Sequence, residues 1–450
     1  MSERPPLRVL MFTYYYPPLG GAGVQRSLKF SKYLPGFGIT PSVISADSAG
    51  YTQDRSLMAE VPAGIEVLRL PHTPALTRLL ALTKRHGGSR APAPAAPVAP
   101  GAAMSAPAPG RWRDLALQLI TSLQVPDDKV AWARQARRAA LALMQRTPFD
   151  LVFSSSPPVS AHLAAMHVAR HAGVPWVADF RDLWTANPDY IAPAWRRVVD
   201  RRLEGRFLAQ ASGVVTVSEH LAASLAERAG PRVPVLSIPN GYDEADFAGA
   251  QAREHEPGSF CIVHAGTFYG QRSPQGFLNG VEQLFEREPA TRARLRIRFI
   301  GNMGARFEPM LSAFGARHPG VLERTGYIAH HQALAEVLSA DALLLVIGGD
   351  DEGAAGVMTG KLFEYLRAGR PILLLGATDG EAARLVREAG AGEVLGHGDP
   401  ARVAALLSRW MAGAAPLPVP GRAAAYERRV LTGRLAEFMT SVHGRFHGRG

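Results

Sequence analysis

The residues best suited to ligand chemistry are a lysine and a glutamate three positions apart, Lys361 and Glu364. Thr359 can cap a helix that begins here, Gly360 allows a ligand to approach the backbone closely, and Leu362 can face the core. The spacing places Lys361 and Glu364 on one face of the first turn. Free N–H groups at a helix start beside a lysine suit a diphosphate, and a carboxylate one turn later suits ribose hydroxyls. The segment predicts a nucleotide site, although an ordinary amphipathic helix with an ion pair has the same pattern.

This segment resembles the donor-site helix of retaining glycosyltransferases of family four, which have the two-domain GT-B fold. The resemblance implies that Lys361 approaches the phosphates or sugar and that Glu364 binds the ribose. Many members carry a second glutamate eight residues earlier, on the transferred sugar, and this sequence has Gly356 there. The nearest acidic residues are Asp350, Asp351 and Glu352. The resemblance therefore predicts the fold more firmly than the transfer chemistry.

Three further loops carry residues that the resemblance assigns to the donor. Gly21 lies in a proline- and glycine-rich loop after an apolar strand at 7–15, which is the opening of a Rossmann-like unit. Arg272 follows a predicted strand at 260–265 and could bind the donor diphosphate. Ile328 lies in a turn where the family holds the base through backbone groups. For the loop at Gly21, a purely structural turn is an open alternative.

A second polar cluster lies at the C-terminal end of a predicted strand in the run 174–184, where Arg181 and Asp182 precede a leucine and a tryptophan. Ligands of doubly wound sheets bind beyond the carboxyl ends of the strands. The run resembles a sugar-transferase branch of the same family, although the loop lacks the histidine that many members have. Asp182 is the candidate for orienting or deprotonating the acceptor hydroxyl, with Arg181 as its partner. His162, in the first turn of a predicted helix, is a third candidate, and purely structural roles remain open for all three.

Length and composition fit this reading. A chain of 450 residues should hold two domains, and 47% apolar with 20% charged residues is typical of a globular protein. The single Cys261 excludes a disulfide framework and suits a reducing compartment. No apolar run of about 18 residues predicts a spanning helix, and the first residues lack the core of a signal peptide. We expect a cytoplasmic protein.

The net charge of +11 predicts an anionic partner or surface. Five arginines share one predicted helix with interleaved apolar residues: Arg196, Arg197, Arg201, Arg202 and Arg206. Such a helix could lie on the inner face of an anionic membrane, or it could pack on its own domain with a solvated basic face. No motif of a nucleic-acid-binding domain is present, so nucleic acid is not an expected partner.

The expected fold class is α/β with GT-B architecture, because predicted strands and helices alternate along the chain. Two Rossmann-like domains would face a central cleft, with a final helix crossing back to the first. The expected acceptor-side domain spans 1–250, with a flexible Ala/Pro-rich insertion at 85–110. The nucleotide-sugar domain spans 258–415, and a helical segment at 416–450 packs on the first domain.

The sequence thus predicts a hexosyl- or other glycosyltransferase that moves a sugar from a nucleotide donor to an acceptor hydroxyl with retention. The acceptor would be a bacterial surface glycan or a lipid-linked sugar in polysaccharide biosynthesis. No cofactor is expected, since the nucleotide sugar is a substrate. No histidine has metal-ligand spacing, so no metal site is expected, and Lys361 and Arg272 would stabilise the leaving diphosphate instead. The alternatives are a non-catalytic sugar-nucleotide-binding protein and a sugar-nucleotide epimerase on the same fold.

Overall fold

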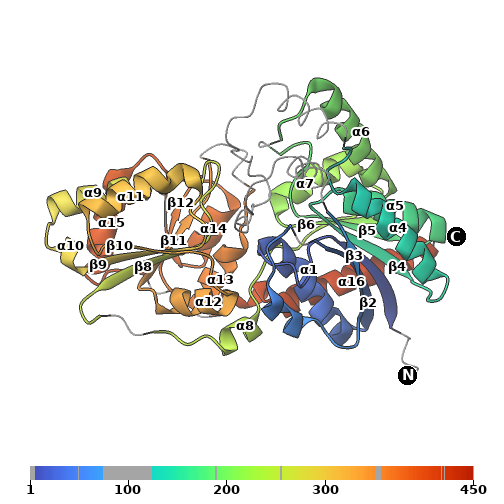
Figure 1. The fold of residues 1–450 in the computed structure, drawn as a ribbon, viewed down its shortest axis with the longest axis horizontal. Coiled ribbons are helices and arrows are strands. Elements are labelled where there is room, and N and C mark those ends of the chain that lie inside the picture. Colours follow the sequence, from blue (N-terminus) through green and yellow to red (C-terminus); the bar gives the residue numbers. More distant parts are fainter. Residues whose placement is uncertain are drawn as a thin grey trace, which may run out of the picture. The chain divides into compact units, whose positions relative to one another are not determined.

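The computed structural model describes residues 6–48, 50–73, 124–187, 190–253, 256–349, 356–416, 418–419 and 421–448. The chain divides into unit 1, Met1–Ile238 with Arg429–Gly450, and unit 2, Pro239–Arg428 (Figure 1). Unit 1 therefore ends before the expected limit at 250, and it includes the final helix. The expected insertion at 85–110 and the acids at 350–352 lie outside the described residues.

Unit 1 is built on a sheet of seven parallel strands in the order β3-β2-β1-β4-β5-β6-β7. Its strands are β1 (Leu7–Thr13), β2 (Ile39–Asp47), β3 (Glu66–Pro71), β4 (Leu151–Ser156), β5 (Trp176–Phe180), β6 (Gly213–Thr216) and β7 (Val235–Ser237). Most strand residues are buried in continuous runs, which is typical of a parallel sheet covered on both faces. The strand order reverses between β1 and β4, where doubly wound sheets bind ligands.

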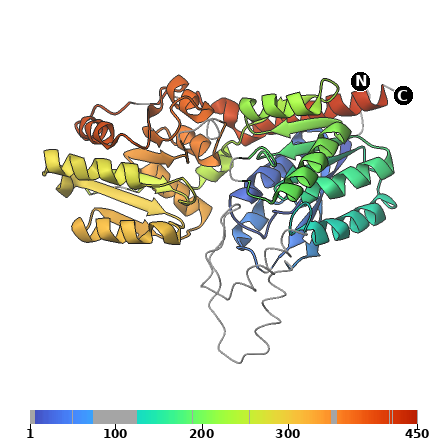
Figure 2. The same cartoon turned by 90° about the horizontal axis from the view of Figure 1, so that it is seen from above.

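The helices of unit 1 lie on both faces of this sheet (Figure 2). They are α1 (Ala22–Tyr33), α4 (Val130–Met144), α5 (Ser160–Ala172), α6 (Ala194–Gln210), α7 (Glu219–Ala229) and α16 (Arg428–His447), with short 3-10 helices η1 (Leu34–Phe37) and η2 (Arg55–Glu60). The final helix α16 contributes Leu431, Leu435 and Met439 to the core of unit 1. Gly213 makes room for it, because a Cβ there would lie 2.9 Å from the Phe438 ring.

Unit 2 has a second parallel sheet of six strands in the order β10-β9-β8-β11-β12-β13. Its strands are β8 (Phe260–Ala265), β9 (Leu295–Ile300), β10 (Leu322–Thr325), β11 (Ala342–Val346), β12 (Ile372–Leu375) and β13 (Gly392–Leu395). Its helices are α8 (Glu244–Ala248), α9 (Gln275–Arg287), α10 (Thr291–Arg294), α11 (Glu308–Arg317), α12 (His330–Ser339), α13 (Gly360–Ala368), α14 (Glu381–Glu388) and α15 (Pro400–Met411), with 3-10 helices η3 (Ala305–Phe307) and η5 (Ala424–Tyr426). Two apolar clusters flank the sheet. The predicted α/β class with two parallel Rossmann-like sheets is confirmed.

Local chemistry explains why the helix that carries Lys361 is short. It begins after Thr359 and ends at Gly369, whose φ of 66° is left-handed and suits a residue without a side chain. Leu362 and Phe363 bury the inner face of the helix against the sheet. Among the described helices, none is long and apolar enough to cross a bilayer.

Candidate functional site

A buried ion pair ties the carboxyl ends of unit 1 together. Asp179, at the end of β5, accepts hydrogen bonds from Arg26 Nε at 3.0 Å and Nη2 at 2.8 Å, and from the Ser155 hydroxyl at 2.7 Å. Arg26 and Asp179 are 1% and 0% exposed, and Arg26 also donates to the Ile238 carbonyl at 2.8 Å. The sequence does not indicate that these two residues pair. Because each charge is met inside the protein, the pair fixes α1 against β4 and β5.

Arg181, a predicted catalytic residue, is held by backbone carbonyls. Its guanidinium donates to Gly23 O at 2.6 Å, Pro157 O at 2.7 Å and Ser156 O at 3.0 Å. Burial lowers its pKa, and the negative charges of Asp182 and Asp179 oppose that change. These bonds tie the loop after β5 to the first turn of α1 and to the end of β4, so the contacts made by Arg181 are structural ones that hold these segments together.

The other two residues predicted for unit 1 catalysis lie in opposite environments. Asp182 is exposed on the loop after β5. His162 is 0% exposed, pairs through Nδ1 with the Ser154 hydroxyl at 2.8 Å, and packs on the Phe180 ring. Burial lowers the pKa of His162 to about 3. A neutral side chain without exposed area cannot contact a substrate in this structure, so His162 belongs to the core rather than among the catalytic candidates.

Gly21 forms the N-cap of α1 with a φ of 89°, which disfavours any residue with a side chain. Nothing lies within 4 Å of the position that a Cβ would occupy there. The glycine is therefore required by its backbone conformation. Its predicted contact with the donor stays a prediction.

In unit 2, Lys361 lies over a glycine at the end of β8. A Cβ on Gly266 would be 2.3 Å from both Cε and Nζ of Lys361, so only glycine leaves space for the lysine. Burial and the nearby positive charge of Arg272 lower the pKa of Lys361 to about 8, while Glu364 opposes the change. The close approach of Gly266 and Lys361 could not be predicted from their positions in the sequence.

Arg272 is the second cation of this region. Its guanidinium lies 4.5 Å from the centre of the Tyr269 ring, and a Cβ on Gly348 would be 3.1 Å from its Cγ. Within the described ranges, neither Arg272 nor Lys361 has a carboxylate at ion-pair distance. Two neighbouring cations that lack a counter-ion among the described residues suit an anionic ligand.

Two buried polar atoms nearby also lack partners among the described residues: His264 Nε2 and Thr359 Oγ1. His264 Nδ1 donates to the Leu344 carbonyl at 2.9 Å, so Nε2 carries the free lone pair of a neutral ring. Burial and the charge of Lys361 lower the pKa of His264 to about 3. The same Gly266 Cβ position lies 3.2 Å from Nε2, so His264 and Lys361 converge on one point. Thr359 is the N-cap of α13 but makes no side-chain capping bond, which leaves the helix start available to a ligand.

Glu364, one turn into α13, lies beside the first residue of α12. His330 Nε2 is 3.6 Å from Glu364 Oε1 and 3.5 Å from Asp246 Oδ2. Ile328, two residues before α12, is half-buried against the apolar cluster that contains α13. The fold thus brings the residues predicted for ribose and base to one side of α13, and it adds His330 and Asp246 to them.

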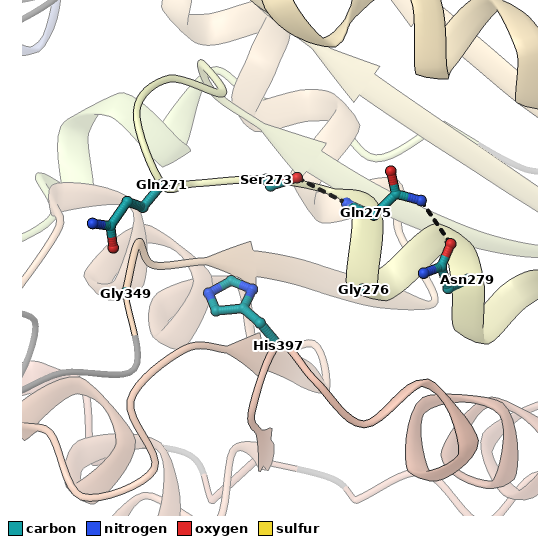
Figure 3. A pocket seen from close by; sticks show the side chains of 7 residues that line it. All are labelled: Gln271, Ser273, Gln275, Gly276, Asn279, Gly349 and His397. Carbon is teal, nitrogen blue, oxygen red and sulfur yellow. Dashed lines mark hydrogen bonds between the residues drawn. The ribbon is translucent and has the colours of Figure 1, made fainter.

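A polar groove of about 350 Å³ lies next to Arg272 and was not predicted (Figure 3). Its lining residues are Gln271, Ser273, Gln275, Gly276, Asn279, Gly349 and His397. Ser273 Oγ accepts the Gln275 amide at 3.2 Å, and Gln275 Nε2 donates to Asn279 Oδ1 at 2.6 Å. Side-chain amides offer both donors and acceptors, which suits hydroxyl-rich ligands.

Comparison with known proteins agrees with this geometry. Residues 21–241 match the family model of the glycosyl transferase 4-like domain. These residues form a glycosyl transferase 4-like domain. The matched range covers nearly all of unit 1 up to β7, together with the first residues of unit 2.

Solved structures are similar to the chain over both units. A glycosyltransferase from Rickettsia africae is 11% identical, with 97% of this chain and 98% of that chain covered and a TM-score of 0.58. The E. coli protein described as trehalose-6-phosphate bound with UDP-2-fluoro glucose is 10% identical, with 98% of each chain covered and a TM-score of 0.58. A putative UDP-N-acetylglucosamine 2-epimerase from Listeria monocytogenes is 12% identical, with 98% and 97% covered and a TM-score of 0.55. At these identities the likeness establishes the fold. No curated protein sequence matches the chain.

Proposed function

We propose that the protein transfers a sugar from a nucleoside diphosphate sugar to an acceptor hydroxyl, with retention at the anomeric carbon. The observation that carries this proposal is the pair of cations, Lys361 and Arg272, which lie without a carboxylate partner among the described residues beside an uncapped helix start. The matched family domain and the similar fold of a protein bound to UDP-2-fluoro glucose support it.

The chemistry follows from the charge that develops on the leaving group. When the glycosidic bond breaks, the nucleoside diphosphate gains negative charge on its terminal phosphate. Lys361, Arg272 and the N-terminal amides of α13 would stabilise that charge, and a half-buried lysine does so more strongly than one in water. In this proposal the cations of the protein take the place that a metal ion occupies in other transferases.

Glu364 would hold the ribose hydroxyls of the donor. Its carboxylate has 23% exposed area, which leaves room for a ligand, and His330 lies close enough to orient it. Ile328 would meet the base. Glu364→Ala should weaken donor binding by about 1.5–3 kcal/mol, because ionised acceptors make the stronger hydrogen bonds.

On the acceptor side, Asp182 would orient or deprotonate the attacking hydroxyl, since it is exposed at the carboxyl end of β5. Arg181 would act through backbone geometry, holding the loop that carries Asp182. The acceptor class that we propose is a glycan or a lipid-linked sugar of polysaccharide biosynthesis.

A second candidate function is sugar-nucleotide binding without transfer. Gly356, a buried residue, stands where the resembling family has its second glutamate, so the transferred sugar would lack that contact. Epimerisation is a weaker alternative, which rests on the likeness to the Listeria protein.

A turnover assay distinguishes transfer, binding and epimerisation. The purified protein is incubated with a panel of nucleotide sugars, with and without glycan and lipid-linked acceptors, and released nucleoside diphosphate is measured. Transfer predicts release that depends on the acceptor and is lost in Asp182→Asn, whose donor affinity stays unchanged. Donor binding without release under any condition would support the binding protein, and a change in the sugar without release would support the epimerase.

A further inference from the structure

Helix α6 of unit 1 buries Phe207 and Leu208, as an ordinary surface helix would, but it also buries charged residues and exposes apolar ones. Its buried side includes three charged residues, Arg196 at 8% exposure and Asp200 and Glu204 at 0%. Its outward side carries Trp195 and Val198, which are 48% and 45% exposed. A helix that only faces water would bury its apolar residues and expose its charges. The exposed apolar residues of α6 therefore call for a partner.

The buried charges of α6 are neutralised inside unit 1. Asp200 accepts from Arg196 Nε at 2.6 Å and from the Tyr190 hydroxyl at 2.5 Å. Glu204 is paired with Arg228 and with the Thr185 hydroxyl. These two carboxylates are the only acidic residues of α6, so the helix presents no negative charge to the outside.

The outward residues form one continuous face. Trp195, Val198, Val199, Arg202 and Arg206 recur at spacings of three and four, which places them along one side of the helix. Arg197 and Arg201 are exposed as well. Ile191, just before the helix, is 96% exposed. The face thus combines a tryptophan and branched aliphatic side chains with guanidinium groups.

We propose that this face of α6 docks the protein on an anionic lipid bilayer. Arginines bind lipid phosphates, and a tryptophan on the same helix face inserts at the headgroup boundary, where its ring is half apolar and half polar. The net charge of +11 adds long-range attraction to such a surface. A nucleic acid would use the arginines but would leave the exposed valines and isoleucine without a role. The inference rests on the packing of α6 and holds whichever reaction the protein catalyses.

Helix α4 supplies a matched control. It exposes Arg137 and Arg138, while its apolar residues Trp132 and Leu143 are buried. Replacing two arginines on α4 therefore removes the same charge from unit 1 as replacing two on α6, without touching an exposed apolar face.

The test is co-sedimentation of the full chain with vesicles of phosphatidylcholine alone or mixed with phosphatidylglycerol. The parent should bind only the mixed vesicles, and binding should weaken as salt rises. Trp195→Ser with Val198→Ser, and separately Arg202→Gln with Arg206→Gln, should each reduce binding about tenfold or more, whereas Arg137→Gln with Arg138→Gln changes it less than about threefold. Unchanged circular dichroism and melting temperature show that each variant is folded.

Three outcomes overturn the proposal: no binding of the parent to mixed vesicles at low salt, equal losses in the α4 and α6 arginine variants, or tighter α6-dependent binding to a single-stranded oligonucleotide than to vesicles. Donor binding measured without lipid is independent of all three. Failure of the lipid contact therefore remains distinguishable from failure of the proposed transfer reaction.

Discussion

At the carboxyl ends of the two sheets, the positively charged side chains have opposite surroundings. In unit 1, Arg26 is neutralised by Asp179 and Arg181 is enclosed by three carbonyl oxygens. In unit 2, Lys361 and Arg272 have no such partners among the described residues, and polar atoms beside them are left unpaired. Both edges follow from the same topology, but among the described residues only the second holds buried cations without a protein oxygen as partner.

The difference shows how the role of a cation at a strand end can be inferred from its partners. A buried cation whose donors all meet protein oxygens makes the scaffold rigid, whereas a cation held over a glycine without a counter-ion is prepared for an anion from outside. By this criterion we place the proposed donor site in unit 2. Unit 1 supplies a fixed frame, on which Asp182 is the exposed exception.

The largest effect should come from the buried pair of unit 1. Asp179→Asn leaves the Arg26 charge buried without its counter-ion, and we expect a loss of about 3–5 kcal/mol in the free energy of unfolding. Asp182→Asn, three residues away but exposed, should change it by less than about 0.5 kcal/mol. Urea denaturation of both variants measures the contrast. Equal stabilities would show that Asp179 and Asp182 do not differ in the way we describe.

A smaller effect concerns the buried histidine of the same unit. The folded-state pKa of His162 is about 3, below its ordinary value of 6.5, so the unfolded chain binds a proton that the folded one does not. The free energy of unfolding therefore decreases as pH falls below about 6.5. His162 should account for about 2 kcal/mol of that decrease near pH 5. His162→Gln should cost stability at neutral pH and lose less of it on acidification. A variant as acid-sensitive as the parent would contradict the core role of His162.

The smallest of the three concerns the glycine beneath Lys361. Gly266→Ala forces the end of a flexible lysine to move, so the fold should be little affected while the ammonium group leaves its position. We expect donor affinity to fall about tenfold, or about 1.4 kcal/mol, by calorimetric titration. Gly315→Ala on α11, where a Cβ meets nothing within 4 Å, is the matched control. Equal donor affinities of the two variants would show that Gly266 is not part of the donor site.

The order of elements in both sheets could be predicted from sequence, because buried parallel strands are continuous apolar runs and turns carry glycine and proline. The strand at 260–265 has the predicted bounds. The helix carrying Lys361 also begins and ends where Thr359 and Gly369 predict.

Side-chain partners far apart in the chain could not be predicted in this way. The pairing of Arg26 with Asp179 joins residues that are 153 positions apart, and the spacing of neither residue indicates it. His330 was set aside because no carboxylate lies near it in sequence, yet the fold brings Asp246 and Glu364 to it. The burial of His162 was missed because a position in the first turn of a helix does not say which face the helix buries.

The most direct test of the account is the affinity of the protein for a nucleoside diphosphate, measured by calorimetry between about pH 7 and about pH 9.5. Because the pKa of Lys361 is about 8, the parent should bind more weakly as the lysine loses its proton through that range. Lys361→Met should bind at least about tenfold more weakly at neutral pH, without this dependence, while Arg384→Met, which removes a cation that is 61% exposed, should behave as the parent does. A folded Lys361→Met variant that binds as tightly as the parent, with the same pH profile, would contradict the assignment of the diphosphate to unit 2.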